Sequence, residues 1–182
     1  PSKITRFRKP WVYSNELENS DRSLDPGSWV SLESSAGETI GYGFYNPHSL
    51  ISFRLFESGK FRNEEQTRAL FFKRMDWAYR TRLRAYSKQI TTGEMGKNSF
   101  RLAFGESDGL PGLVIDLFDT LESKAYPVVQ CHSAGSDQLI LWMQQWFDEK
   151  MSVQSGLLRN DIPIRDLEKT KRFSAPIVTE II

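Results

Sequence analysis

The stretch over residues 105–116, GESDGLPGLVID, constrains the fold more than any other, because it places two turn signals directly before a strongly apolar run. Asp108-Gly109 favours a turn, since glycine accepts a positive φ without a Cβ clash and aspartate bonds its own backbone. Pro111-Gly112 signals a second turn. The apolar residues that follow suit a strand covered on both faces, so the sequence predicts a buried strand entered through an elaborate connection.

Around this stretch the pattern predicts a small α/β unit. Strands are expected at residues 100–104, 113–118, 126–133, 153–159 and, in a shorter form, 163–168. A helix is expected after Ser133, because apolar side chains recur there at i, i+3, i+4, i+7 and i+8. These side chains are Leu139, Trp142, Met143, Trp146 and Phe147. That helix face should pack on the sheet.

The first third of the chain reads as a small β domain. Short alternating or aromatic segments at residues 28–32, 39–45 and 50–55 are separated by Gly, Pro, Ser and Asn, which is typical of a small barrel. In the last segment, Ile51, Phe53 and Leu55 are expected on one face. At the start of the chain, Trp11 and Val12 are expected in the core, because apolar aromatic residues at the start of a small β domain usually fill it.

A long helix is expected from Asn63, which can cap it, with Gln66 at the third helical position as in a capping box. One face carries side chains at helical spacing, namely Phe71, Met75, Ala78, Arg82 and Ala85. Residues 67–88 hold seven Lys/Arg and one acid, Asp76. This segment is either a solvated linker helix or a basic surface for an RNA backbone, because arginine pairs bidentately with phosphate.

Composition limits the partners of the chain. The formal net charge is +1, so any basic surface for nucleic acid must be local. One cysteine excludes an internal disulfide and favours a reducing compartment. No apolar run approaches the roughly 20 residues that span a bilayer, and the basic N-terminus has no secretory h-region. We therefore expect a soluble, cytoplasmic protein with no membrane partner.

Several motifs resemble the ribosomal RNA large subunit methyltransferase I family. They are GESDGLPGLVID, GYGFYNPHSLISFRL, PWVYSNE, VVQCHSAG and LLRNDIPIRDLE. The resemblance implies a PUA domain, in which residues 10–16 form a short helix, a central α/β domain with a strand–strand–helix–strand–strand plan, and a Rossmann-like methyltransferase domain. It also implies methylation of cytosine C5 in large-subunit rRNA with S-adenosylmethionine.

The fold class predicted is α+β, with an N-terminal PUA-like β pseudobarrel, a linker helix and a small central α/β domain. The PUA-like RNA-binding domain is expected over residues 1–75, including the start of the helix, and the helix and central domain over 76–182. The C-terminal methyltransferase domain is expected to be absent. The chain has no G-x-G-x-x-G motif. No cofactor is therefore expected in this chain, although the full-length family uses S-adenosylmethionine. No metal is expected either, because two histidines and one cysteine cannot build a typical zinc site without carboxylate help.

No catalytic residue is expected. Cys131 lies in an apolar strand and reads as a small buried hydrophobe. Four carboxylates, Glu106, Asp108, Asp116 and Asp119, lie close together in the sequence, but their spacing matches no EF-hand loop. Asp108 and Asp119 are explained by the turns in which they are expected. Glu106 and Asp116 have no local explanation.

Candidate RNA-binding residues come from three places. The basic N-terminus is either a solvated tail or an arm that contacts phosphate. The β segments contribute a histidine and an arginine, and the alternative for this arginine is a solvated position on a strand face. The long helix contributes its arginines. The candidates are Arg6, Arg8, Lys9, His48, Arg54, Arg80 and Arg84.

The function predicted is RNA recognition, with ribosomal RNA as partner, within a methyltransferase-like protein whose catalytic domain this chain lacks, so that the chain alone is inactive. The alternative is a non-catalytic scaffold that binds a separate methyltransferase subunit or forms a homodimer. Salt dependence separates the two, since phosphate binding weakens steeply with salt and an apolar interface does not.

Overall fold

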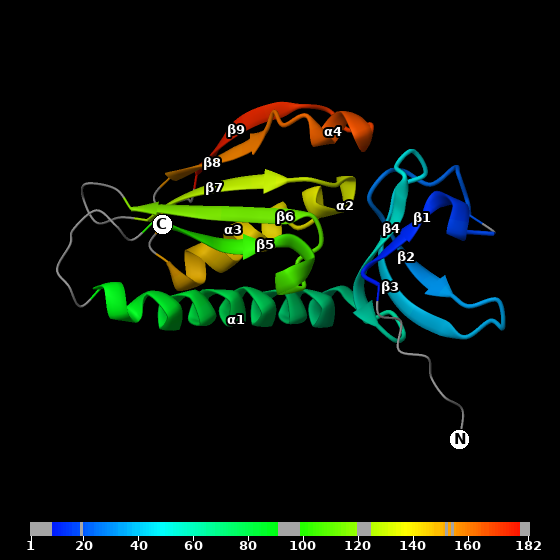
Figure 1. Ribbon diagram of the computed structural model, residues 1–182, viewed down its shortest axis with the longest axis horizontal. Coiled ribbons are helices and arrows are strands. Elements are labelled where there is room, and N and C mark those ends of the chain that lie inside the picture. The colour runs from blue at the N-terminus through cyan, green and yellow to red at the C-terminus, as the bar shows by residue number, and fades with distance from the viewer. Residues whose placement is uncertain are drawn as a thin grey trace, which may run out of the picture.

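The computed structural model describes residues 9–18, 20–90, 99–119, 125–151, 153 and 155–178, which form an α+β fold with two sheets joined by a long helix (Figure 1). The first part contains β1 (Trp11–Tyr13), η1 (Ser14–Glu16), β2 (Ser28–Glu33), β3 (Thr39–Tyr45), β4 (Ile51–Ser58) and α1 (Glu64–Ile90). The second contains β5 (Phe100–Phe104), η2 (Gly105–Asp108), β6 (Leu113–Asp119), β7 (Ala125–Cys131), α2 (Ala134–Asp137), α3 (Ile140–Lys150), β8 (Ser155–Asn160), α4 (Ile164–Leu167) and β9 (Phe173–Val178).

The predicted β domain is an antiparallel four-stranded sheet in the order β1-β4-β3-β2. The helix expected over residues 10–16 is wrong in its first half, which forms the edge strand β1. Val12 is buried there, and the N–H of Leu55 donates to the carbonyl of Pro10 at 2.8 Å. Pairing with β4 holds residues 11–13 extended, whereas the resemblance implied a helix there, and only Ser14–Glu16 is helical, as a single 3₁₀ turn.

Strand β4 does not keep the simple alternation expected of it. Its register against β3 shifts between Tyr42 and Gly43, so one residue of β4 is skipped in the pairing. Such a bulge changes which side chains face the core. Phe53 and Phe56 are buried, whereas Leu55, expected beside Phe53, is only half-buried.

Helix α1 begins as predicted. The side chain of Asn63 accepts a hydrogen bond from the backbone N–H of Gln66 at 2.8 Å, which satisfies one of the donors left free at a helix start. Phe71, Met75 and Ala78 are fully buried on one face, as their spacing predicts.

The second sheet has the order β5-β6-β7-β8-β9 and is antiparallel except between β7 and β8. That parallel step is made through α2 and α3. The strand expected over residues 163–168 is wrong, since helix α4 occupies it and the last strand is β9. Pro163 has a φ of −61°, which suits a helix start, and the helix turns Arg165 into the interior, where 1% of it is exposed.

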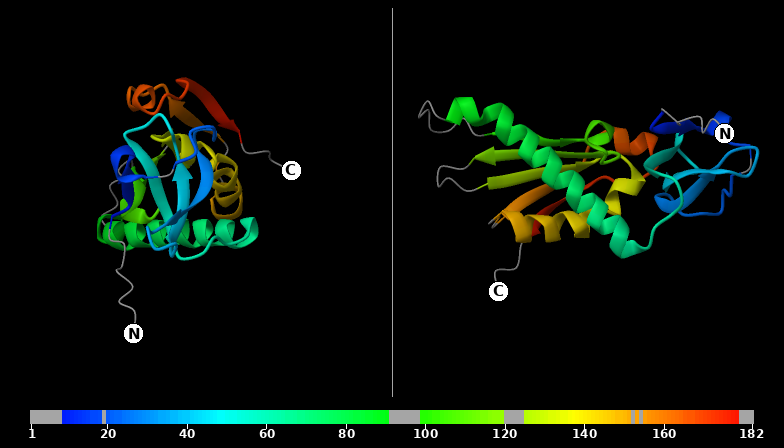
Figure 2. Two further views of the ribbon diagram at one scale, coloured as in Figure 1. Left: turned by 90° about the vertical axis from the view of Figure 1, so that its right-hand side faces the viewer. Right: turned by 90° about the horizontal axis from the view of Figure 1, so that it is seen from below.

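One hydrophobic core connects the two sheets. Helix α1 runs along the five-stranded sheet beside α3, and the four-stranded sheet lies at the end where α1 starts (Figures 1 and 2). Phe44 and Phe56 of the first sheet belong to the same buried cluster as Phe71 of α1 and Trp146 of α3. The apolar face expected on α3 is confirmed, because Met143, Trp146 and Phe147 are all fully buried and contact that core. The relative position of the two sheets is therefore set by shared side chains.

Gly109 has the conformation that its turn requires, with φ +69° in the left-handed region. A Cβ there would also lie 3.0 Å from Nε of Arg74. We expect Gly109→Val to lower the free energy of unfolding by about 1 kcal/mol or more, through backbone strain. Urea denaturation measures this, and an unchanged midpoint would contradict the role assigned to the turn.

Candidate nucleic-acid interface

Two of the described cations of α1, Arg74 and Arg82, point inward. Arg82 donates to both carboxylate oxygens of Asp108, at 2.5 and 2.6 Å. Arg74 donates to the carbonyls of Phe56 and Gly109, at 2.7 and 2.9 Å, and to the Glu57 carboxylate at 2.9 Å. Burial lowers the pKa of Arg74, while the Glu57 charge partly opposes that shift. These arginines fasten α1 to its neighbours and do not offer free charge to a ligand.

Other cations of α1 point to solvent. Lys73, Arg80 and Arg84 are exposed, and they share one helix face with Trp77, which is 59% exposed. Their spacing is i, i+4, i+7 and i+11, which aligns side chains along a helix. We call these four residues the α1 stripe. In Figure 2, seen from below, α1 lies in front of the sheet.

No exposed acid interrupts this part of the helix. Between Arg68 and Ala85 the one acidic residue is Asp76, which is half-buried. Its carboxylate accepts a hydrogen bond from Nε1 of Trp146 at 2.9 Å, so it is held against α3. The α1 stripe is therefore uniformly cationic apart from its central tryptophan.

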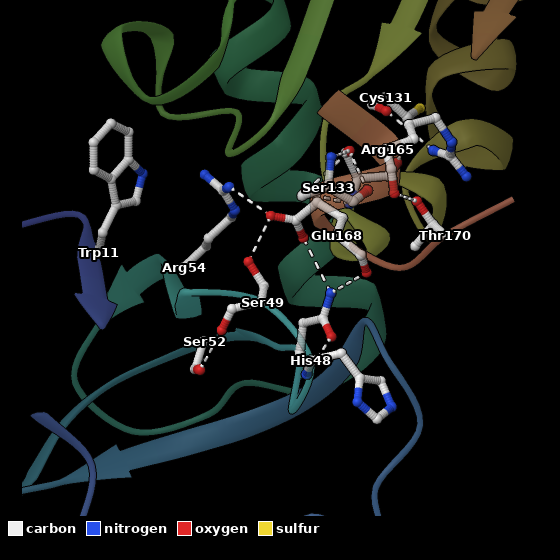
Figure 3. A network of polar contacts seen from close by, with 12 residues as sticks. Trp11, His48, Ser49, Ser52, Arg54, Cys131, Ser133, Arg165, Glu168 and Thr170 are labelled. Atoms are coloured by element: carbon white, nitrogen blue, oxygen red, sulfur yellow. Dashed lines mark hydrogen bonds and ion pairs between the residues drawn. The ribbon is translucent and has the colours of Figure 1, made fainter. Parts of the chain in front are cut away.

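A buried polar network joins the two sheets (Figure 3). Arg54 on β4 donates to Glu106 at 3.1 Å and to Glu168, which follows α4, at 3.0 Å. Glu168 also accepts from the hydroxyl of Ser49 at 2.8 Å and from the amide of Asn46 at 3.1 Å. Because Glu168 is only 3% exposed, these donors replace the water that its charge would otherwise need. We call Asn46, Ser49, Arg54, Glu106 and Glu168 the junction network.

The edge of the junction network is aromatic. Nε1 of Trp11 donates to Glu106 at 2.7 Å, and the Arg54 guanidinium lies 5.8 Å from the Trp11 ring. His132 is half-buried nearby, and its pKa is lowered, first by burial and then by the positive charge of Arg54. Glu106, which had no local explanation in the sequence, is therefore a partner of the N-terminal sheet.

The structure separates the predicted RNA-binding residues. Arg6 and Arg8 lie outside the described residues. Lys9 is exposed and pairs with Glu16 at 3.5 Å. His48 is exposed in the β3–β4 loop, where its N–H donates to the Asn46 side chain at 3.0 Å.

Arg54 is placed differently from the others. The expectation that it lies on a solvated strand face is wrong, since it is 8% exposed and bonded to two carboxylates. Arg80 and Arg84 are exposed on the same face of α1. The structure thus brings two of the predicted residues together with Lys73 and Trp77, and assigns Arg54 to the junction network.

The remaining candidate groups have local roles. Cys131 is buried, and burial raises the pKa of its thiol. Asp116 accepts two hydrogen bonds from Arg101, at 2.8 and 3.0 Å. The described part of the chain has no group of three or more His, Cys, Asp or Glu placed to hold a metal ion. None of its helices is both long enough and apolar enough to cross a membrane.

Comparison with known proteins supports the first part of the fold as a distinct unit. The PUA-like domain family matches residues 2–58. The described residues of this range form a PUA-like domain. The fold class predicted from the sequence, a PUA-like sheet, a helix and an α/β unit, is thereby confirmed.

Relatives match the chain over most of its length. It is 32% identical over 136 residues to ribosomal RNA large subunit methyltransferase I of Alteromonas mediterranea, covering 75% of this chain and 31% of the relative. It is 28% identical over 178 residues to the protein of that name from Pseudoalteromonas atlantica, covering 96% and 41%. The resemblance seen in the motifs is confirmed, and the chain spans about two-fifths of these relatives or less.

Solved structures agree in fold. The structure "A putative sam-dependent methyltransferase from Streptococcus mutans" superposes with a TM-score of 0.62 at 14% identity, over 95% of this chain and 39% of that one. A methyltransferase-like structure complexed with SAH has a TM-score of 0.59 at 15% identity, over 81% and 35%. At these identities the likeness concerns the fold alone.

The turn from β7 into α2 does not have the form of a glycine-rich cofactor loop. The turn from β7 into α2 is closed by a capping box, in which the Ser133 hydroxyl accepts from the Ser136 N–H at 3.2 Å, and both serines are buried. A nucleotide-type cofactor needs a glycine-rich loop at such a turn, where its backbone can approach the ligand closely.

Proposed function

We propose that this chain is the RNA-recognition portion of an S-adenosylmethionine-dependent rRNA (cytosine-C5) methyltransferase-like protein. The observation that carries the proposal is the α1 stripe, a row of exposed cations without an exposed acid, beside a PUA-like domain. The names of the relatives favour RNA over the scaffold alternative. The proposal includes a division of the chain into residues 1–75 and 76–182. It also includes a cytoplasmic location, because the single, buried cysteine is compatible with a reducing compartment.

Local clustering explains how a chain of net charge +1 would bind a polyanion. Each cation that neutralises a phosphate releases a counterion, so a few aligned cations suffice for salt-sensitive binding.

Other predicted residues have smaller roles in the proposal. Lys9 and His48 are exposed on the PUA-like domain, where Lys9 pairs with Glu16, and both are kept as candidate RNA contacts. Arg6 and Arg8 stay predictions from the sequence. Arg54 holds the PUA-like domain in place through the junction network, and so acts on RNA only through the orientation of that domain.

The test reverses the charge of the predicted RNA-binding cations. We expect Arg80→Glu with Arg84→Glu to weaken RNA binding and to reduce the log–log salt slope by roughly 0.7–0.9 for each phosphate that the protein no longer neutralises. Helix content should persist, because arginine and glutamate have similar helix propensity. The measurement is fluorescence anisotropy of an rRNA hairpin at several salt concentrations.

A matched variant controls for net charge. Arg159→Glu with Arg172→Glu changes the charge by the same amount at two exposed sites outside α1. Each of these arginines forms an exposed ion pair, with Asp161 and Asp166, and such pairs contribute little to stability. We expect this variant to keep most of its affinity and salt slope. Equal losses in both variants, or no binding by the unmodified protein at low salt, would contradict the proposed interface.

A further inference from the structure

We infer that the α1 stripe recognises an unpaired segment of RNA, with a base stacked on Trp77 and the flanking phosphates held by Lys73 and Arg80. This inference rests on the proposed function and adds the form of RNA that the site accepts. It assigns a binding role to a side chain that neither the core nor the junction network uses.

Trp77 differs from the other described tryptophans. Trp146 is fully buried, Trp29 and Trp142 pack against the core, and Trp11 donates to Glu106. Trp77 alone among them is 59% exposed and has no ring or hydrogen-bond partner among the described residues. A large aromatic side chain stabilises a protein by burying apolar area, and Trp77 buries only a minor part of its surface. A ligand with a flat apolar face would cover it.

The neighbours of Trp77 indicate what kind of ligand that is. Lys73 lies one helical turn before it and Arg80 one turn after it on the same face. From Lys73 to Arg84 the helix rises about 16 Å, which gives room for more than one nucleotide along the stripe. A ligand that fits must therefore present a π face between two negative charges, as a nucleotide strand does.

The same geometry discriminates between unpaired and paired RNA. In a duplex the faces of the bases are already stacked on each other, so a side chain on a helix surface cannot reach them without separating the stack. An unpaired base has a free face, and stacking on an aromatic side chain is tolerant of base identity. Phosphate contacts alone would treat the two forms alike. We therefore expect the preference for unpaired RNA to depend on Trp77.

Charge favours RNA over a protein partner at this surface. An exposed tryptophan is also common at protein interfaces, where the fully buried centre is depleted of charge. Here cations stand on both sides of the ring, and no exposed acid lies between Arg68 and Ala85. Such a surface is complementary to a polyanion.

The experiment compares two RNAs with two variants. An unstructured pyrimidine-rich oligonucleotide and a blunt RNA duplex of equal length are titrated against the unmodified protein, Trp77→Ala and Trp77→Phe. We expect Trp77→Ala to reduce the affinity for the unstructured RNA about tenfold and to change that for the duplex little, because one base can no longer stack. Trp77→Phe should retain part of the affinity. The salt slope should stay constant in both variants, since every phosphate-binding cation is kept.

Leu141→Ala is the control, because Leu141 is 69% exposed on α3, outside the stripe. It should bind both RNAs like the unmodified protein, and circular dichroism should show unchanged helix content in every variant. If Arg80→Glu with Arg84→Glu weakens binding but Trp77→Ala does not, the stacking inference fails and the proposed function stands. Equal reductions on both RNAs also overturn the inference. If the unmodified protein binds neither RNA, both fail.

Discussion

Glu168→Ala is expected to lower the free energy of unfolding by about 3 kcal/mol or more. The substitution removes the carboxylate that accepts from Arg54, Ser49 and Asn46 in a site that is almost fully buried. Removing one partner of a buried ion pair costs about 3–5 kcal/mol, because the other charge stays desolvated. Arg54 keeps one acidic partner, Glu106, so the lower part of that range applies. Urea denaturation followed by circular dichroism measures the change.

Asp166→Asn provides the matched control two residues away. Asp166 is exposed and pairs with Arg172 at the surface, so neutralising it should change stability little. If Glu168→Ala and Asp166→Asn shift the urea midpoint equally, the junction network does not hold the two sheets together as the structure indicates.

Gly135→Leu is expected to destabilise the protein by up to about 3 kcal/mol, the typical upper cost of overpacking a core. A Cβ at Gly135 would lie 2.1 Å from Cγ of the buried Phe44 ring, on the other sheet. Leucine is a better helix former than glycine, so propensity within α2 would change stability in the opposite direction. A fall in the melting temperature therefore reports the contact between α2 and the PUA-like domain.

A double variant tests the cause. Phe44→Ala alone should destabilise by leaving a cavity, whereas Phe44→Ala with Gly135→Leu should destabilise by less than the sum of the two single changes, because the leucine enters the space of the ring. Additive effects would show that Gly135 and Phe44 do not meet, and would contradict the close approach of the two sheets.

Local sequence signals located most of the second sheet. The two turns of residues 105–116 and the apolar run after them place β6, and the spacing of Leu139, Met143 and Phe147 places the buried face of α3. These features depend on residues close in sequence, whose preferences and periodicity are readable directly. The cap at Asn63 is of the same kind.

Features that depend on distant residues were missed. Arg54 and Glu168 are separated by 114 positions, and nothing in either local segment indicates the other. The segment 163–168 was expected to be a short strand, but Arg165 points inward, where it donates to the carbonyl of Cys131 at 3.0 Å and to the Asp137 carboxylate at 2.9 Å. Trp77 could have been found, since it falls between Lys73 and Arg80 on the face opposite Met75.

Mapping where RNA touches the protein tests the central claim most directly. An rRNA fragment with an unpaired loop is photo-crosslinked to the unmodified protein, and the attached peptides are identified by mass spectrometry. The account predicts crosslinks on the peptide of α1 that contains Trp77, reduced in Arg80→Glu with Arg84→Glu and retained in Arg159→Glu with Arg172→Glu. Crosslinks confined to β8 and β9, with none on α1, would contradict it.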